Sequence, residues 1–274
     1  MRFGYRTGYN AGLLMAKRDY LVLLTNDDGY GSSGLVALEE ALRPLVEVVV
    51  VAPYEEKSAV SHGVTIHNPL RLVEMGKNRY ALTGTPADCV IFALTKLLPK
   101  TPNLVISGIN NGPNLGDDIH YSGTVAGARE ASFHLIPSMA VSLVSSKNGA
   151  DFKQAAEFIR QIVDRESADM IPAGTFWNIN VPSEAIRGVK FTRQGSRLSW
   201  GQVEEKEDPR GRKYYWIGRD NSEWNPQPDT DYQAIKDRLV SITPLQHDHT
   251  DYRSLRELLR HAAEMEGKAS SSDS

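Results

Sequence analysis

Two adjacent carboxylates stand at the end of an apolar run near the start of the chain. Leu21 to Leu24 are followed by Thr25, Asn26, Asp27 and Asp28. Neighbouring carboxylates repel each other, so both are ionised at neutral pH only where a cation or hydrogen-bond donors compensate their charge. A hard divalent cation prefers oxygen ligands and commonly takes only one or two carboxylates from a protein. The pair therefore indicates a metal site, with a capped turn as the structural alternative.

Three further loops carry side chains that could complete such a site. Ser58 lies in a polar loop after the second apolar run, and Asn110, Asn111 and Asn114 follow another. Ser122-Gly123-Thr124 opens a helix-like segment, whose backbone N–H groups and hydroxyls suit an anion. Carboxylates, a hydroxyl and amide oxygens are ligands of Mg²⁺ or Mn²⁺ rather than of zinc, which favours phosphoryl chemistry. Taken singly, the same residues are also typical of a surface loop, a left-handed turn and helix caps.

Strands and helices that alternate along the chain must position these residues. Strands are predicted over 20–25, 46–52, 79–82, 103–107 and 138–144, and helices over 35–45, 86–98, from 122 onward and over 151–166. The second strand is apolar almost throughout, as expected of a parallel strand covered on both faces. The pattern predicts an α/β fold with a mostly parallel sheet. In such sheets ligands bind at the carboxyl ends of the strands, where the informative loops begin.

A glycine pattern in the first loop allows a competing interpretation. Gly29-x-Gly31-x-x-Gly34 follows a strand, opens a helix and has Glu55 about twenty residues on, as in the dinucleotide fingerprint. On that pattern alone the chain would be an NAD-dependent oxidoreductase. Asp27 and Asp28 count against it, because they would set two negative charges beside the turn that should hold a pyrophosphate.

Composition excludes several other classes of protein. With 274 residues, 41% hydrophobic and 24% charged, the chain has room for one large α/β domain or a core with an appendage. The net charge of −3 argues against binding a nucleic-acid duplex through a broad basic surface. Cys89 is the only cysteine, which excludes disulfide frameworks within one chain. No apolar run approaches the roughly 20 residues that cross a bilayer, so a cytoplasmic enzyme with no membrane contact is expected.

The chain divides into four predicted regions. Residues 1–18 form an N-terminal extension, 19–172 a catalytic core, 173–266 a hairpin and oligomerisation region with a terminal helix, and 267–274 a disordered tail. Short strands predicted over 176–181, 189–192, 213–217 and 239–242 are interpreted as β-hairpins that project from the core. The terminal helix is expected over about 252–265, and the exposed Trp200, Trp216 and Trp224 are candidate oligomer contacts.

Taken together, these motifs resemble the SurE family, the survival-protein nucleotidases. The segments that carry the resemblance are Leu24-Thr-Asn-Asp-Asp-Gly29, Val51-Ala-Pro53 with Lys57-Ser58-Ala59, Leu82-Thr-Gly-Thr-Pro-Ala-Asp-Cys-Val90, Ser107-Gly-Ile-Asn-Asn-Gly-Pro-Asn-Leu-Gly116 and Tyr121-Ser-Gly-Thr-Val-Ala-Gly-Ala-Arg-Glu130. The match is dense over residues 20–145. Its combination of motifs is specific, although no single motif would be.

The resemblance implies an activity and a site. It implies a Rossmann-like three-layer core and a metal-dependent phosphatase of nucleoside 5′- and 3′-monophosphates, with polyphosphate as a side substrate. One divalent metal per subunit, Mg²⁺ or Mn²⁺, would be held by Asp27, Asp28, Ser58 and Asn110. Phosphate contacts would come from Asn114, Ser122, Gly123 and Thr124, with Asp27 and Asp28 as the catalytic carboxylates. Homodimers or homotetramers are expected, and a non-catalytic nucleotide-binding scaffold is a further alternative.

Overall fold

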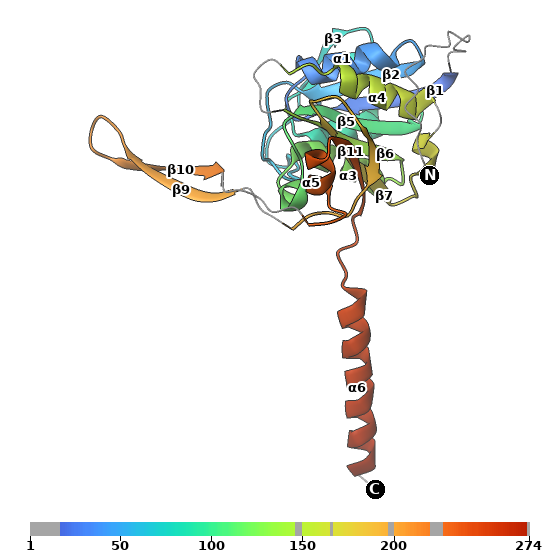
Figure 1. Cartoon of the computed structure of the whole chain (residues 1–274), viewed down its shortest axis with the longest axis vertical. Coiled ribbons are helices and arrows are strands. Elements are labelled where there is room, and N and C mark those ends of the chain that lie inside the picture. Colours follow the sequence, from blue (N-terminus) through green and yellow to red (C-terminus); the bar gives the residue numbers. More distant parts are fainter. Residues whose placement is uncertain (1–16, 146–149, 165–166, 197–199, 220–226, 273–274) are drawn as a thin grey trace.

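β1 lies near the middle of a nine-stranded sheet in the order β3-β4-β2-β1-β5-β6-β7-β11-β8 (Figure 1). The structure is a computed structural model that describes residues 17–145, 150–164, 167–196, 200–219 and 227–272. The strands of the sheet are β1 (Lys17–Thr25), β2 (Val46–Pro53), β3 (Leu72–Gly76), β4 (Arg79–Leu82), β5 (Leu104–Asn111), β6 (Ser138–Val144), β7 (Thr175–Pro182), β8 (Gly188–Phe191) and β11 (Leu239–Gln246). From β4 to β7 neighbouring strands are parallel, whereas β3 and β11 pair antiparallel to β4 and β7. This confirms the mostly parallel sheet.

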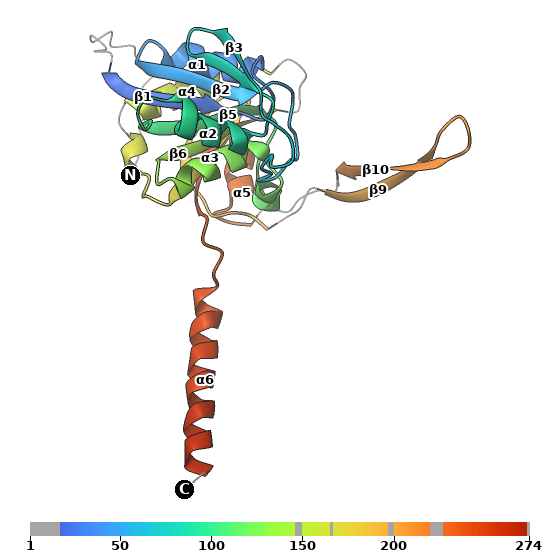
Figure 2. The same ribbon diagram turned by 180° about the vertical axis from the view of Figure 1, so that it is seen from behind.

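Helices cover both faces of the sheet. α1 (Ser33–Leu42) and α4 (Lys153–Asp164) pack together on one face, and Figure 2 shows α2 (Pro86–Phe92) and α3 (Gly123–Phe133) on the other. β1 serves both layers, because Val22 and Leu24 join the core beneath α1 while Leu21 and Leu23 join the core beneath α2. The result is the three-layer α/β core that the resemblance implies.

The strand order reverses at β1. The chain moves from β1 to β2 and β4 on one side, and then crosses to β5 on the other side of β1. Thr25 at the end of β1 stands beside Ser107 in β5, so the loops that leave these two strands diverge above the sheet. A crevice at such a switch point is where open α/β sheets bind their ligands. The residues predicted to do chemistry lie in the loops after β1 and β2, at the end of β5 and in the segment from there to the start of α3.

Two strand predictions need correction. β5 does not end at Ser107 but continues to Asn111, with an irregular register between Ser107 and Asn110. Of the C-terminal strands, only β9 (Trp200–Glu207) and β10 (Lys213–Arg219) form a projecting hairpin (Figure 1). β7, β8 and β11 belong to the main sheet instead. The reason is visible in β7, which is buried on both faces after its first residue and could not stand in solvent.

The C-terminal helix is longer than predicted. α6 runs from Tyr252 to Ser272 and extends away from the core (Figure 1), so most of the tail predicted to be disordered is helical. Its run of good helix formers, Ala262-Ala263-Glu264-Met265-Glu266, favours a helix through residue 266, whereas nothing in the sequence from Gly267 to Ser272 explains the last turns. α5 (Asp231–Lys236) and the short helices η1 (Ala93–Leu97), η2 (Gly116–His120) and η3 (Ser167–Met170) complete the described elements. None of the helices in the described residues is long and apolar enough to cross a membrane.

Residues 1–16 and Trp224 lie outside the described residues, so the predictions for the N-terminal extension and for Trp224 are not addressed by the structure. The side chain of Trp200 is likewise not described. Trp216 on β10 is 60% exposed, and its role as an oligomer contact stays a prediction.

Residue 34, the second residue of α1, must be glycine because it lies against the backbone of β5. A Cβ added to Gly34 would lie 2.0 Å from the carbonyl oxygen of Ile109, whereas one added to Gly31 would meet nothing within 4 Å. We expect Gly34→Ala to lower the free energy of unfolding by roughly 3 kcal/mol, the upper end of overpacking costs. Chemical denaturation beside the matched control Gly31→Ala measures this. Equal stability of the two variants would contradict the packing described.

Candidate active site

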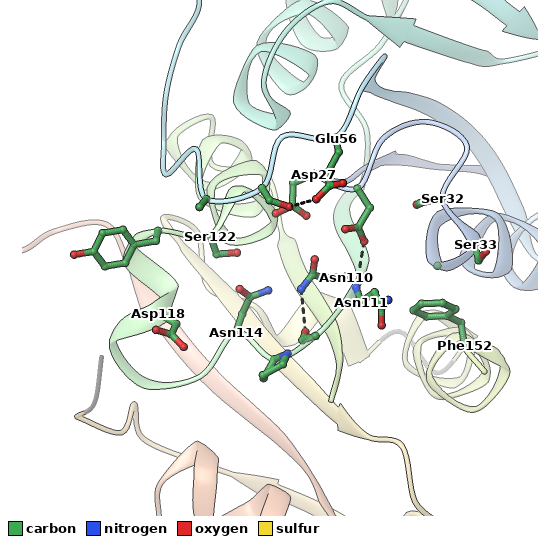
Figure 3. Close-up of a pocket in the computed structure, with 17 residues that line it drawn as sticks. Asp27, Ser32, Ser33, Glu56, Asn110, Asn111, Asn114, Asp118, Ser122 and Phe152 are labelled. Carbon is green, nitrogen blue, oxygen red and sulfur yellow. Dashed lines mark hydrogen bonds between the residues drawn. The ribbon is translucent and has the colours of Figure 1, made fainter. Parts of the chain in front are cut away.

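A cavity of about 480 Å³ opens at the carboxyl ends of β1, β2 and β5 (Figure 3). Six of the eight predicted site residues line it: Asp27, Asp28, Ser58, Asn110, Asn114 and Ser122. They come from four separate segments of the chain, which only the fold brings together. Gly123 and Thr124 do not line the cavity.

Thr124 and Gly123 instead hold Asp27 in place. The hydroxyl of Thr124, which is fully buried, donates a hydrogen bond of 2.5 Å to Oδ1 of Asp27. A Cβ on Gly123 would approach Cβ of Asp27 to 2.9 Å, so only glycine lets the start of α3 come this close. The backbone oxygen of Asp27 also accepts from the N–H of Lys57 at 2.7 Å. Asp27 is thus fixed from three sides, and its Oδ2 is left for the cavity.

The two carboxylates have no cationic partner among the described residues. The backbone N–H of Asn111 donates to Oδ2 of Asp28 at 3.2 Å. Burial raises the pKa of Asp27 to about 6, and the charge of Asp28 adds to the effect against the opposing Thr124 hydrogen bond. Burial also raises the pKa of Asp28, with a contribution from the charge of Glu56. A cation bound beside these two carboxylates would stabilise their ionised forms.

The donor set fits a hard cation. The side-chain nitrogen of Asn110 donates to the carbonyl oxygen of Gly112 at 2.9 Å, which leaves its Oδ1 as a ligand. Ser58 donates its hydroxyl proton to Oε1 of Glu56 at 2.6 Å, so its oxygen lone pairs can still bind a metal. The described residues contain no group of three or more His, Cys, Asp or Glu side chains that could hold a metal ion. A cation here would therefore need neutral oxygens beside Asp27 and Asp28, as Mg²⁺ and Mn²⁺ accept.

The N-terminus of α3 faces the same cavity. Ser122 caps this helix, and its Oγ accepts the N–H of Val125 at 3.1 Å. The first turn of a helix presents backbone N–H groups and a partial positive charge, which favours an anion. The cavity therefore combines two adjacent carboxylates with the N-terminus of a helix.

A buried amide network holds Asn114, and the sequence analysis missed it. The backbone N–H of Asn114 donates to Oδ1 of Asn180 at 2.9 Å, and its carbonyl oxygen accepts from Asn178 and Asn180 at 2.8 and 2.9 Å. Its side-chain nitrogen donates to Ser142 Oγ at 2.7 Å. The detectable signal was the pair Asn178 and Asn180, two amides on one face of an otherwise apolar strand. Buried amides are kept in a core mostly by the hydrogen bonds that they make, here those to Asn114, while Oδ1 of Asn178 has no partner among the described residues.

Asn111, one of the amides considered as possible ligands, also lines the cavity, and its backbone N–H binds Asp28. The other lining residues Glu56, Asp118, Tyr121 and Phe152 gave no usable signal in the sequence, because each is an ordinary residue type for a loop or a helix start. Asp231 of α5 lies farther away and acts indirectly. Its Oδ2 accepts the N–H of Gly116 at 2.8 Å and so anchors the start of η2, whose Asp118 lines the cavity.

The fold and the cavity define an α/β protein in which two adjacent carboxylates and the N-terminus of a helix meet at the switch point of the sheet. The family model described as Survival protein SurE matches residues 22–200. The 5′-nucleotidase SurE of Pelobacter propionicus is 48% identical over 238 residues, covering 86% of this chain and 96% of its own length. That of Vibrio cholerae is 43% identical over 252 residues, covering 90% and 95%.

The solved structures agree with this placement. The crystal structure of the SurE protein from Aquifex aeolicus superposes with a TM-score of 0.77 at 42% identity, covering 86% of this chain and 97% of that one. The chain belongs to the SurE family.

The buried charge of Asp27 should cost stability when no metal is bound. A carboxyl whose pKa rises from 3.8 to about 6 on folding stabilises the fold only while it is protonated, so this contribution is complete below pH 3.8 and is lost as the pH rises through about 6. Two pKa units correspond to about 3 kcal/mol. We therefore expect Asp27→Asn, which keeps an acceptor for Thr124, to melt at a higher temperature than the wild type at pH 8 in EDTA.

The advantage of Asp27→Asn should shrink as the pH falls from 6 towards 4. Asp169→Asn, at an exposed position, is the matched control and should melt like the wild type at both pH values. A variant that melts below the wild type at pH 8 in EDTA would contradict the charge argument.

Proposed function

We propose that this chain is a phosphomonoesterase that hydrolyses nucleoside 5′- and 3′-monophosphates to nucleoside and phosphate, with inorganic polyphosphate as a side substrate. The observation that carries the proposal is the meeting of two uncompensated carboxylates with the N-terminus of α3 in one cavity. The names of the relatives, 5′-nucleotidase SurE, supply the substrate class. Neither observation alone would be sufficient, since the cavity does not specify a nucleoside.

One divalent cation per subunit, Mg²⁺ or Mn²⁺, is part of the proposal. Asp27, Asp28, Ser58 and Asn110 would hold it. Bound there, the cation would neutralise phosphate oxygens and lower the pKa of a water molecule. The fit of the donor oxygens and the missing positive charge around Asp27 and Asp28 support this assignment.

The residues of the chain would orient the phosphate. The N–H groups at the start of α3 and the hydroxyl of Ser122 lie beside the cavity and can donate hydrogen bonds to phosphate oxygens. Asn114 projects into it from a backbone fixed by Asn178 and Asn180. Asp27, held by Thr124, is our first choice to position or deprotonate the attacking water. Positioning of this kind is the main contribution a protein makes to phosphoryl transfer.

Two other functions were considered for the same loops. An NAD-dependent oxidoreductase would need a pyrophosphate at the turn where Asp27 and Asp28 stand, and both carboxylates face the cavity. A non-catalytic nucleotide-binding scaffold would use the same residues but release no phosphate. The metal-dependent phosphatase explains the paired carboxylates, which the other two functions do not require.

Phosphate release from nucleoside monophosphates tests the proposal. With Mg²⁺ or Mn²⁺ we expect turnover that EDTA abolishes. Asp27→Asn and Asp28→Asn should each lose at least about a hundredfold in kcat/KM, because even outer partners of metal ligands are worth 10–100-fold. The exposed Asp169→Asn serves as the control and should retain wild-type activity. Turnover in EDTA, or full activity in both active-site variants, would overturn the proposal.

A fluorescence titration with NADH, in which we expect no binding, addresses the oxidoreductase alternative.

A homodimer or homotetramer in the cytoplasm is the proposed state. α6 carries Leu255, Leu258 and Leu259 on one stripe, and they are 41%, 66% and 62% exposed in the single chain. We expect light scattering to give a mass of at least two chains. Leu258→Glu with Leu259→Glu should lower that mass, whereas Arg260→Glu on another side of the helix should not. A monomeric wild type at micromolar concentration would refute the assembly.

A further inference from the structure

A second cavity lies on the other side of η2 from the candidate active site. Its volume is about 460 Å³, and it shares no lining residue with the first cavity. η2 separates the two: Asp118 lines the first cavity, while Ile119 and His120 line the second. The remaining walls come from α3, β7, the end of β11 and the segment after β8. Nothing in the proposed phosphatase reaction uses this cavity.

Basic side chains from four separate segments gather in the second cavity. Arg129 of α3, Arg193 after β8, His120 of η2 and His249 after β11 all line it. Asp248 is the one carboxylate among the described lining residues. It already accepts hydrogen bonds from the N–H of Thr250, at 2.9 Å, and from the hydroxyl of Tyr252. The cavity therefore carries an excess of positive charge in a chain whose net charge is −3.

Arg129 is the least compensated of these basic groups. Its Nε is buried and has no hydrogen-bond partner among the described residues. No described carboxylate pairs with its guanidinium, and its described contact is the ring of Phe176, whose centroid lies 5.9 Å from Cζ. Arg193, by contrast, donates to Oε1 of Gln227 at 3.1 Å and lies near Asp229. A half-buried guanidinium without an acceptor is costly, and an anion would remove that cost.

The other walls suggest what kind of anion fits. Phe176, Pro244 and Leu245 form an apolar side, while the hydroxyl of Thr192 is already bonded to Ser241 and Thr243 at 2.7 and 2.8 Å. Two arginines, with two histidines as further possible hydrogen-bond donors, match a group that carries several negatively charged oxygens. Arginine binds such groups through a planar fork that suits phosphate oxygens. The apolar side leaves room for the organic part of a phosphate ester.

We propose that this second cavity is a non-catalytic binding site for a phosphate group, with Arg129 as its central ligand. The phosphate can belong to inorganic phosphate or to a phosphomonoester such as a nucleoside monophosphate. The shared chemistry is the dianion, and the apolar wall is the feature that would favour the ester. The site is independent of the proposed hydrolysis, since it shares none of its residues.

Removal of metal separates the two cavities experimentally. In EDTA the first cavity exposes Asp27, Asp28, Glu56 and Asp118 to a ligand, and this charge repels phosphate. Calorimetric titration of the full chain in EDTA with inorganic phosphate, and separately with AMP, therefore reports the second cavity. We expect one site per chain for each probe. Tighter binding of AMP would show that the apolar wall contributes, and equal affinity would assign the site to the phosphate group alone.

Arg129→Met is the decisive variant, because it keeps the apolar stem against Phe176 and removes the charge. We expect it to weaken phosphate binding at least tenfold, the value of lost charge-assisted hydrogen bonds. His249→Gln, on the exposed rim, should weaken binding less and protects the test if Arg129→Met fails to fold. Arg210→Met, an equal loss of charge on the distant β9–β10 hairpin, is the matched control and should bind like the wild type.

Three results would overturn the proposal. The first is that neither probe binds the wild-type chain in EDTA. The second is that Arg129→Met or, if that variant does not fold, His249→Gln binds phosphate as tightly as Arg210→Met does. The third is a change in the mass of the assembly in Arg129→Met, because the cavity would then be a contact between copies of the chain. None of these depends on phosphatase activity, so the proposal can fail while the proposed function stands.

Discussion

The burial of two adjacent carboxylates is the constraint on which the rest of the site depends. Asp27 is 5% exposed, and no described cation balances it or its neighbour Asp28. Everything packed around Asp27 serves to keep it ordered in spite of this cost: the hydroxyl of Thr124, the missing side chain of Gly123 and the N–H of Lys57. Such a buried charge lowers the stability of the fold, so a protein keeps it where function requires it.

The sequence alone was sufficient for the parts of the fold that rest on local pattern. The apolar strand before Asp27, the βαβ unit that follows and the amphipathic stretch that became α4 all have a periodicity that survives in the structure. Six of the predicted site residues meet in one cavity because they lie at the end of a strand, in the loop that follows one or at the start of a helix, and parallel strands bring those positions to one edge. Where the position of a residue follows from the order of strands and helices, residue type and spacing are enough to predict that it belongs to the site.

Other features could not be predicted, because they depend on contacts between distant segments. The membership of β7 and β11 in the main sheet is decided by burial on both faces, which short strands separated by polar loops do not reveal. The hydrogen bond by which Thr124 holds Asp27 could not be predicted for a similar reason. The hydroxyl of a threonine at a helix start can donate a hydrogen bond to a bound ligand or to another side chain. Only the fold places the hydroxyl of Thr124 2.5 Å from the carboxylate of Asp27. Asn178 and Asn180 act across the sheet on a residue more than sixty positions away.

The β9–β10 hairpin and α6 both stand clear of the core (Figure 1). A two-stranded ribbon is marginally stable in water without further packing, and an isolated helix gains little from its own hydrogen bonds. In the proposed dimer or tetramer, the folding of these segments would be coupled to association, and the entropy of ordering would be lost when the chains meet. Secondary-structure content and self-association would then be one concentration-dependent equilibrium. Dilution would unfold these segments while the sheet beneath them keeps its structure.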